Sequence, residues 1–173
     1  MFKRLTGLSA ALLLAACSTI RTGPPVAPLD KSAQWALLPI VNQTETPQAG
    51  LRAEALVESG LRNGGILTLQ HYPVRLNQET LLEPAERKAA DDARQWAAQQ
   101  GMRYAVTGAV TEWRYKVGVD GEPAVGMALQ VIDLKSGQVV WSGSGGKTGF
   151  SRESLAGTAQ KLVNQLLAGA GLE

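Results

Sequence analysis

The hydrophobic period of this sequence changes at Gly101, and that change limits the possible folds more than any other feature. Before it, apolar residues recur at helical spacing from Ala49 to a glycine pair at 64–65, and again from Pro84 to Ala97, which predicts two amphipathic helices. After it, residues 104–115 and 124–133 alternate between apolar and polar, which predicts strands with one buried face. Since each element must bury its apolar face against another, helices are expected to pack on a sheet.

Two short apolar runs precede these helices and add strands to the expected sheet. Residues 35–41 and 66–70 are too short for helices and long enough for buried strands. Pro39 lies inside the first run, and a proline there predicts either an edge strand or a bulge.

The last third of the chain is expected to add a hairpin and a helix. A turn over 133–137 leads back into a strand over 139–144, and Ser151 can cap a final helix with a buried apolar stripe. The expected order is therefore β-α-β-α-β-β-β-α. This is a single mixed α/β domain over residues 35–173, with helices packed on the sheet.

The first residues are expected to form a secretory signal. Lys3 and Arg4 precede an apolar stretch over 8–14 that is too short to span a bilayer, which needs about 20 residues. The motif Leu14-Ala15-Ala16-Cys17 matches the lipobox of bacterial lipoproteins, in which the cysteine becomes the acylated N-terminus. The alternative is an ordinary secretory signal that contains a cysteine. Cys17 is the only cysteine in the chain, so no disulfide can use it.

The mature chain is expected to begin at Cys17 after removal of residues 1–16. Ser18 follows the cysteine where an aspartate would favour inner-membrane retention, so the outer membrane is the expected location. Residues 17–34 are rich in proline and lack a hydrophobic period, which predicts a flexible tether spanning roughly 23 Å. Cleavage would leave 15 basic and 15 acidic residues, and this balance does not favour nucleic-acid binding.

Residues for common catalytic chemistry are missing. His71 is the only histidine, so neither a histidine–cysteine metal cluster nor a base for the serines is expected. His71 itself is interpreted as a surface or turn residue. Gly146-Lys147-Thr148 resembles the end of a phosphate-binding loop, but that motif requires a glycine at position 141, which is Trp141 here. We therefore expect neither an enzyme nor a cofactor other than the lipid on Cys17.

A glycine-rich segment over 143–152 ends in one large apolar residue, Phe150, between Lys147 and Arg152. An aromatic ring beside cations suits a membrane interface, where the cations meet phosphates. The alternative is a hydrophobic staple, in which Phe150 precedes the Ser151 cap and packs on the last helix. The residues alone leave both interpretations open.

An acidic turn lies between two of the expected strands, with Asp120 and Glu122 near its tip. In a monomer this is an ordinary solvated turn. In a ring of subunits the tips could line an opening, and rings of carboxylates select cations.

The sequence resembles the periplasmic domain of CsgG-type lipoproteins. The similar segments cover nearly the whole mature chain: 37–43, 49–50, 104–108, 129–133 and 137–141. Within that superfamily the chain is most similar to the PelC family of exopolysaccharide-secretion lipoproteins, by its length, its short tether, the 120–122 turn and residues 149–154.

That resemblance implies a non-enzymatic homo-oligomeric ring, a dodecamer in the family, lying against the outer membrane. The ring would surround a PelB-like exporter and guide a cationic polysaccharide. By the same resemblance Asp120 matches a funnel acid and Phe150 replaces a membrane-directed tryptophan. Arg103 is a weaker candidate for an intersubunit contact. The alternative is an LpoB-like activator of a peptidoglycan synthase, although such activators have a long disordered leash.

Overall fold

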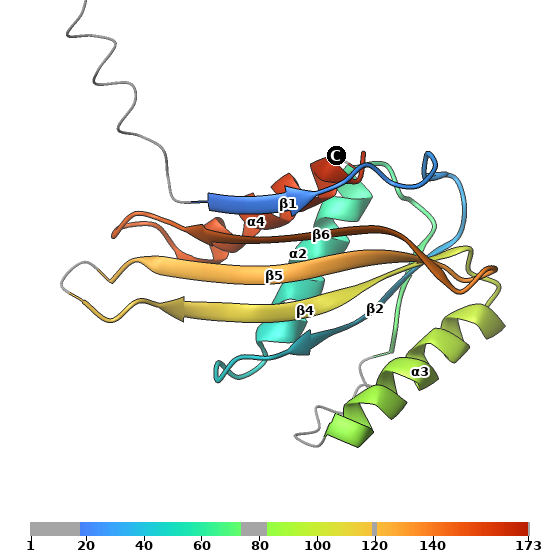
Figure 1. Cartoon of the computed structure of the whole chain (residues 1–173), viewed down its shortest axis with the longest axis horizontal. Helices are drawn as coiled ribbons and strands as arrows, with labels where there is room; N and C mark the ends of the chain where they lie inside the picture. Colours follow the sequence, from blue (N-terminus) through green and yellow to red (C-terminus); the bar gives the residue numbers. More distant parts are fainter. Residues whose placement is uncertain (1–17, 74–82, 119–120, 173) are drawn as a thin grey trace, which may run out of the picture.

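A computed structural model describes residues 18–73, 83–118 and 121–172, which form one six-stranded mixed sheet with helices on it (Figure 1). The strand order is β1-β6-β5-β4-β2-β3. The strands are β1 (Ser18–Thr22), β2 (Trp35–Asn42), β3 (Leu69–His71), β4 (Tyr104–Tyr115), β5 (Pro123–Asp133) and β6 (Gln138–Thr148). The helices are α2 (Ala49–Asn63), α3 (Glu83–Gln99) and α4 (Leu155–Gly169). The expected α/β class and element order are confirmed, and β1 is an addition.

The β1 strand lies in the segment expected to be a flexible tether. It pairs antiparallel with β6, with Ser18 opposite Lys147 and Thr22 opposite Gly143. The chain after it stays on the domain, because the Trp141 indole donates a hydrogen bond to the Gly23 carbonyl at 2.9 Å. The sheet therefore begins at Ser18, seventeen residues before the expected first strand.

The β6 strand is longer than expected and includes part of the glycine-rich segment. It continues through 143–148, between β5 and β1, where we had expected a loop. Glycines carry no side chain and so hide the alternation that identifies a strand. The last helix also begins later than expected: Ser154 is its N-cap, and the Ser154 hydroxyl accepts from the Gly157 amide at 3.0 Å.

Of the two alternatives predicted for Pro39, an edge strand or a bulge, the structure shows an irregularity of the bulge kind. The pairing of β2 with β4 shifts register between Leu37 and Ile40. The Thr107 hydroxyl donates to the Pro39 carbonyl at 2.7 Å across this irregularity. The short strand expected at 66–70 is instead β3, which begins at Leu69.

The two faces of the sheet differ in their cover. Helices α2 and α4 bury the main core against one face, where β2 contributes Trp35 and Leu37. Helix α3 packs on the opposite face over β2, against Ala36 and Leu38 (Figure 1). Among the described residues, no helix has the length and apolar character needed to cross a membrane.

Candidate functional site

One end of the sheet gathers exposed apolar and cationic side chains. This hairpin end consists of the β4–β5 hairpin, the β6–α4 connection and Ser18, which lie together in Figure 1. Val117 is fully exposed, Phe150 is 56% exposed and Tyr115 is 51% exposed. Of the six large exposed apolar residues in the described part of the chain, these three lie at the hairpin end. Such grouping is unusual for a face in contact with water alone.

The position of Phe150 bears on its two interpretations. A staple requires Phe150 to stand immediately before the helix cap, but the cap is Ser154 and not Ser151. The Phe150 carbonyl instead accepts a hydrogen bond from the Glu153 amide at 2.9 Å, which turns the chain before α4. The ring is left more than half exposed. These observations favour contact with something outside the subunit over packing on the last helix.

Three cationic residues lie at the same end of the sheet as Phe150. Arg152 is exposed, and Lys147 is half-buried beside Ser18 in the sheet. Lys116, from the hairpin, donates a hydrogen bond to the Thr148 hydroxyl at 3.0 Å. A hydrogen bond from Lys161, with a smaller effect of Lys147, holds the pKa of the Glu153 carboxyl below its usual value.

The predicted acidic turn is described only in part. Glu122 is 45% exposed, and its carboxylate lies 3.9 Å from the Lys116 ammonium. The Lys116 amide donates to the Glu122 carbonyl at 2.8 Å, which closes the hairpin below its tip. Asp120 and the lipidation candidate Cys17 lie outside the described residues.

Arg103 makes its ion pair within the subunit. Its guanidinium lies 2.6 Å from the Asp133 carboxylate and stacks over the Tyr104 ring at 5.2 Å. This joins the start of β4 to the end of β5, at the end of the sheet opposite the hairpin end. Its Nε atom is buried and has no hydrogen-bond partner among the described residues.

A buried carboxylate that sequence reasoning missed links α2 to the sheet. Glu54 is only 2% exposed, and one of its oxygens accepts from the Ile40 amide at 2.9 Å. Its other oxygen lies 2.8 Å from Nε2 of His71. Nδ1 of His71 lies 3.3 Å from Glu58. The hydrogen bond to Glu54 raises the pKa of His71 above its usual value, against the effect of burial.

His71 is therefore half-buried within an ion-pair cluster at the end of β3, where we had expected a surface or turn residue. The sequence contained one sign of this cluster: Glu54 falls within the apolar stripe of its helix, between Ala53 and Val57. A carboxylate on a buried face needs a partner. No sequence pattern indicated which distant residue would supply it. Among the described residues, no group of three histidine, cysteine or acidic side chains could hold a metal ion.

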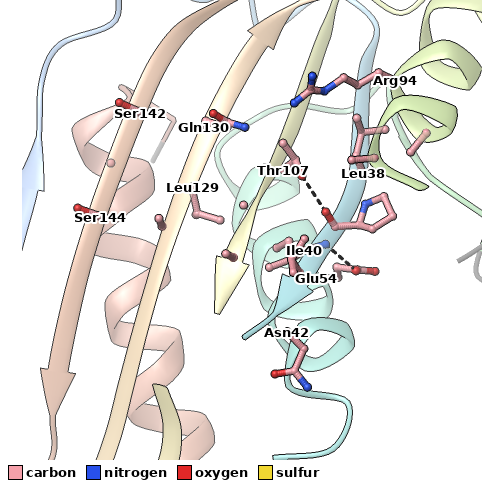
Figure 2. Close-up of a pocket in the computed structure, with 18 of the residues that line it drawn as sticks. Leu38, Ile40, Asn42, Glu54, Arg94, Thr107, Leu129, Gln130, Ser142 and Ser144 are labelled. Atoms are coloured by element: carbon pink, nitrogen blue, oxygen red, sulfur yellow. Dashed lines mark hydrogen bonds between the residues drawn. The ribbon is translucent and has the colours of Figure 1, made fainter. Parts of the chain in front are cut away.

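A hollow lies beside α3 on the face of β4, β5 and β6 that is opposite α2 and α4 (Figure 2). We call this surface the open sheet face, made of Thr107, Ala109, Ala128, Gln130, Ser142 and Ser144. The hollow has a volume of about 1040 Å³. A second hollow of about 960 Å³ shares Ala128 and Ser144 with it and continues along the sheet. Arg21 of β1 and Arg94 of α3 also line the first hollow.

Two solved structures match this chain over most of its length. Both are PelC from Paraburkholderia phytofirmans, at 38% sequence identity. One match covers 88% of this chain and 96% of that one, with a TM-score of 0.74. The other, a leucine-to-methionine variant, covers 87% and 97%, with a TM-score of 0.73. Both are dodecamers, in space groups P6 and C2 respectively.

A more distant structure shares the fold. Lipoprotein GNA1162 from Neisseria meningitidis covers 77% of this chain and 94% of its own, with a TM-score of 0.54 and 18% identity. Neither a protein-family model nor a curated protein matches the sequence.

Proposed function

Because this chain belongs to the PelC family, we propose that it is a non-enzymatic outer-membrane lipoprotein that forms a periplasmic ring. The ring assists export of a cationic exopolysaccharide, Pel, through a PelB-like outer-membrane pore. The observation that carries this proposal is the 38% identity to PelC, which is a dodecamer in two different space groups. A shared assembly in unrelated lattices is not a product of one crystal packing.

The proposed lipid anchor agrees with the geometry of the hairpin end. After cleavage of residues 1–16, the acylated Cys17 would be bonded to Ser18, which already lies in β1 beside Lys147. Consecutive Cα atoms are about 3.8 Å apart. The acyl chains would therefore leave the domain beside the exposed Phe150 and Val117, and no free leash would separate domain and membrane.

With the acyl chains leaving the domain at this point, the hairpin end would face the membrane. Phe150 and Val117 would enter the headgroup boundary, while Lys147 and Arg152 would meet lipid phosphates. The absence of a leash also disfavours the alternative of a peptidoglycan-synthase activator. Such an activator must reach across the periplasm, whereas the segment proposed as a tether is paired with the sheet from Ser18.

The acidic turn supplies the proposed contact with the polymer. A ring would repeat Asp120 and Glu122 once per subunit, and a circle of carboxylates attracts a cationic chain. Glu122 is partly neutralised by Lys116 at 3.9 Å, so Asp120 is the residue we expect to contribute most.

Replacement of Asp120 tests this role. Asp120→Asn should lower Pel secretion at least severalfold while the amount of lipoprotein in the outer membrane stays unchanged, because one charge per subunit is lost from the opening. Asp91→Asn is the matched control, since Asp91 is an aspartate with 76% side-chain exposure on α3. Secretion is measured with a polymer-specific stain in a strain lacking the native gene. Equal secretion by both variants would remove Asp120 from the export path.

A further inference from the structure

We propose that Glu153 is a positioning residue: its carboxylate holds the turn over 149–153 so that Phe150 is directed away from the domain. The turn joins β6 to α4 at the hairpin end (Figure 1). The inference rests on the membrane contact proposed above for Phe150, and it adds the side chain that prepares this contact.

Hydrogen bonds of the backbone close the turn on both sides of Phe150. The Gly149 amide donates to the Pro123 carbonyl at 2.8 Å, which fixes the point where the chain leaves β6. The Phe150 carbonyl accepts from the Glu153 amide at 2.9 Å, which turns the chain toward α4. Phe150 itself belongs to neither element. The direction of its ring therefore depends on the conformation of this turn.

The Glu153 side chain ties the turn to α4. One carboxylate oxygen accepts from the Lys161 ammonium at 2.7 Å, and the other accepts from the Thr158 hydroxyl at 3.3 Å. Thr158 is fully buried. A buried hydroxyl requires a hydrogen-bond partner, and the Glu153 carboxylate provides one. The turn is thus anchored in the interior of the domain as well as at its surface.

Gly149 packs directly against this carboxylate. A Cβ at position 149 would lie 2.5 Å from Oε2 of Glu153 and 2.5 Å from the Thr158 hydroxyl. The backbone just before Phe150 therefore rests on the pair formed by Glu153 and Thr158. Glu153 contacts Gly149 through its side chain and Phe150 through its amide, so one residue holds the chain before and at the exposed ring.

An ordered turn favours membrane contact because the ring is directed outward before binding. A segment that is disordered in solution must be ordered when it binds, and this lowers its affinity. Ordering the backbone of one residue costs about as much free energy as a tenfold change in affinity. Loss of the Glu153 carboxylate is therefore expected to weaken binding to lipid even though Phe150 is still present.

Removal of the carboxylate separates positioning from simple electrostatics, because the two predict opposite changes. Glu153→Ala removes a negative charge and releases Lys161, so electrostatics alone would strengthen binding to an anionic membrane. Positioning predicts that binding weakens roughly tenfold. Flotation of residues 18–173, without the lipid, on vesicles of phosphatidylethanolamine and phosphatidylglycerol measures the change.

Glu58→Ala is the matched control. The side chains of Glu58 and Glu153 are both 28% exposed, and each pairs with a basic side chain at 2.7 Å. Glu58 lies on α2 and outside the hairpin end, so its replacement should leave binding to the vesicles unchanged. An equal loss in Glu58→Ala would overturn the proposal.

Thr158→Val repeats the test without a change in charge. This variant loses the hydroxyl that anchors Glu153 but keeps the branched shape of the side chain. Binding to the vesicles should weaken, by less than in Glu153→Ala, because Lys161 still holds the carboxylate. Thermal unfolding of each variant identifies the folded proteins. Binding like that of the wild type by folded Thr158→Val would overturn the role of the buried anchor.

A double variant determines whether Glu153 acts through Phe150. Phe150→Ala alone should weaken binding, and adding Glu153→Ala should cause no further loss, because no ring is left to position. A further loss in the double variant would overturn the proposal, and so would Glu153→Ala that binds as tightly as the wild type or more tightly. In both cases the membrane contact of Phe150 stands. If Phe150→Ala itself binds like the wild type, the membrane contact is wrong, and the positioning role with it.

Discussion

Glu54 shows at the residue scale how one buried carboxylate completes an irregular sheet edge. Strand β3 ends at His71, opposite Leu37, so within residues 18–73, 83–118 and 121–172 the β2 backbone beyond that point has no neighbouring strand on this side. The Ile40 amide would be left without a partner, and Glu54 accepts from it at 2.9 Å. An unpaired buried amide costs about 1–3 kcal/mol, which accounts for a carboxylate on the apolar stripe of α2.

The second oxygen of Glu54 makes the stability of the domain depend on pH through His71. The pKa of His71 is raised in the folded state above its usual value of 6.5, so protonated His71 stabilises the fold. That contribution is complete below pH 6.5 and is lost as the pH rises through the higher folded-state pKa.

We expect the free energy of unfolding to fall across that interval in the wild type, and the fall to be absent in His71→Gln. Urea denaturation at closely spaced pH values from 5.5 to about 9 measures both. His71 is the only histidine, so no other imidazole contributes. Parallel profiles for the two proteins would show that the ion-pair cluster does not stabilise the fold.

At the scale of elements, periodicity predicted those parts of the sheet and helices that bury a continuous face. The limits of α2 and β4 follow from apolar residues at spacings of 3.6 and 2, and the structure confirms them. Local side-chain pattern determines these elements, so one sequence contains enough information to find them.

Strand β1 and the second half of β6, which pair with each other, were not predicted from the sequence. A Cβ at Gly145 would lie 2.9 Å from the Thr19 carbonyl and 3.1 Å from the Ile20 side chain. Glycine is therefore what allows β1 to approach β6, and the same glycine erases the pattern that identifies a strand. Glu54 and His71 were missed for a related reason, because their contact joins residues 17 positions apart.

At the scale of the whole molecule, the hairpin end is expected to determine how the domain meets the membrane. Phe150 is 56% exposed, and burying that fraction of a phenylalanine contributes about 1–1.5 kcal/mol. Phe150→Ala should therefore weaken binding to anionic phospholipid vesicles roughly tenfold.

Flotation with vesicles measures this binding. The assay uses residues 18–173 produced without the lipid, because the acyl chains would mask a modest change in affinity. Leu67→Ala is the matched control, since Leu67 is 79% exposed and follows α2 away from the hairpin end. Equal losses for both variants, or none for Phe150→Ala, would exclude a specific membrane contact at this end.

The central proposal is that this chain works as a closed ring with as many subunits as the dodecameric PelC of known structure. Its most direct test is the mass of the mature lipidated protein in detergent, measured by light scattering with the detergent contribution removed. The account predicts a single species with the mass of about twelve subunits that persists on dilution, as in the dodecameric relative. A protein that stays monomeric at high concentration would contradict it.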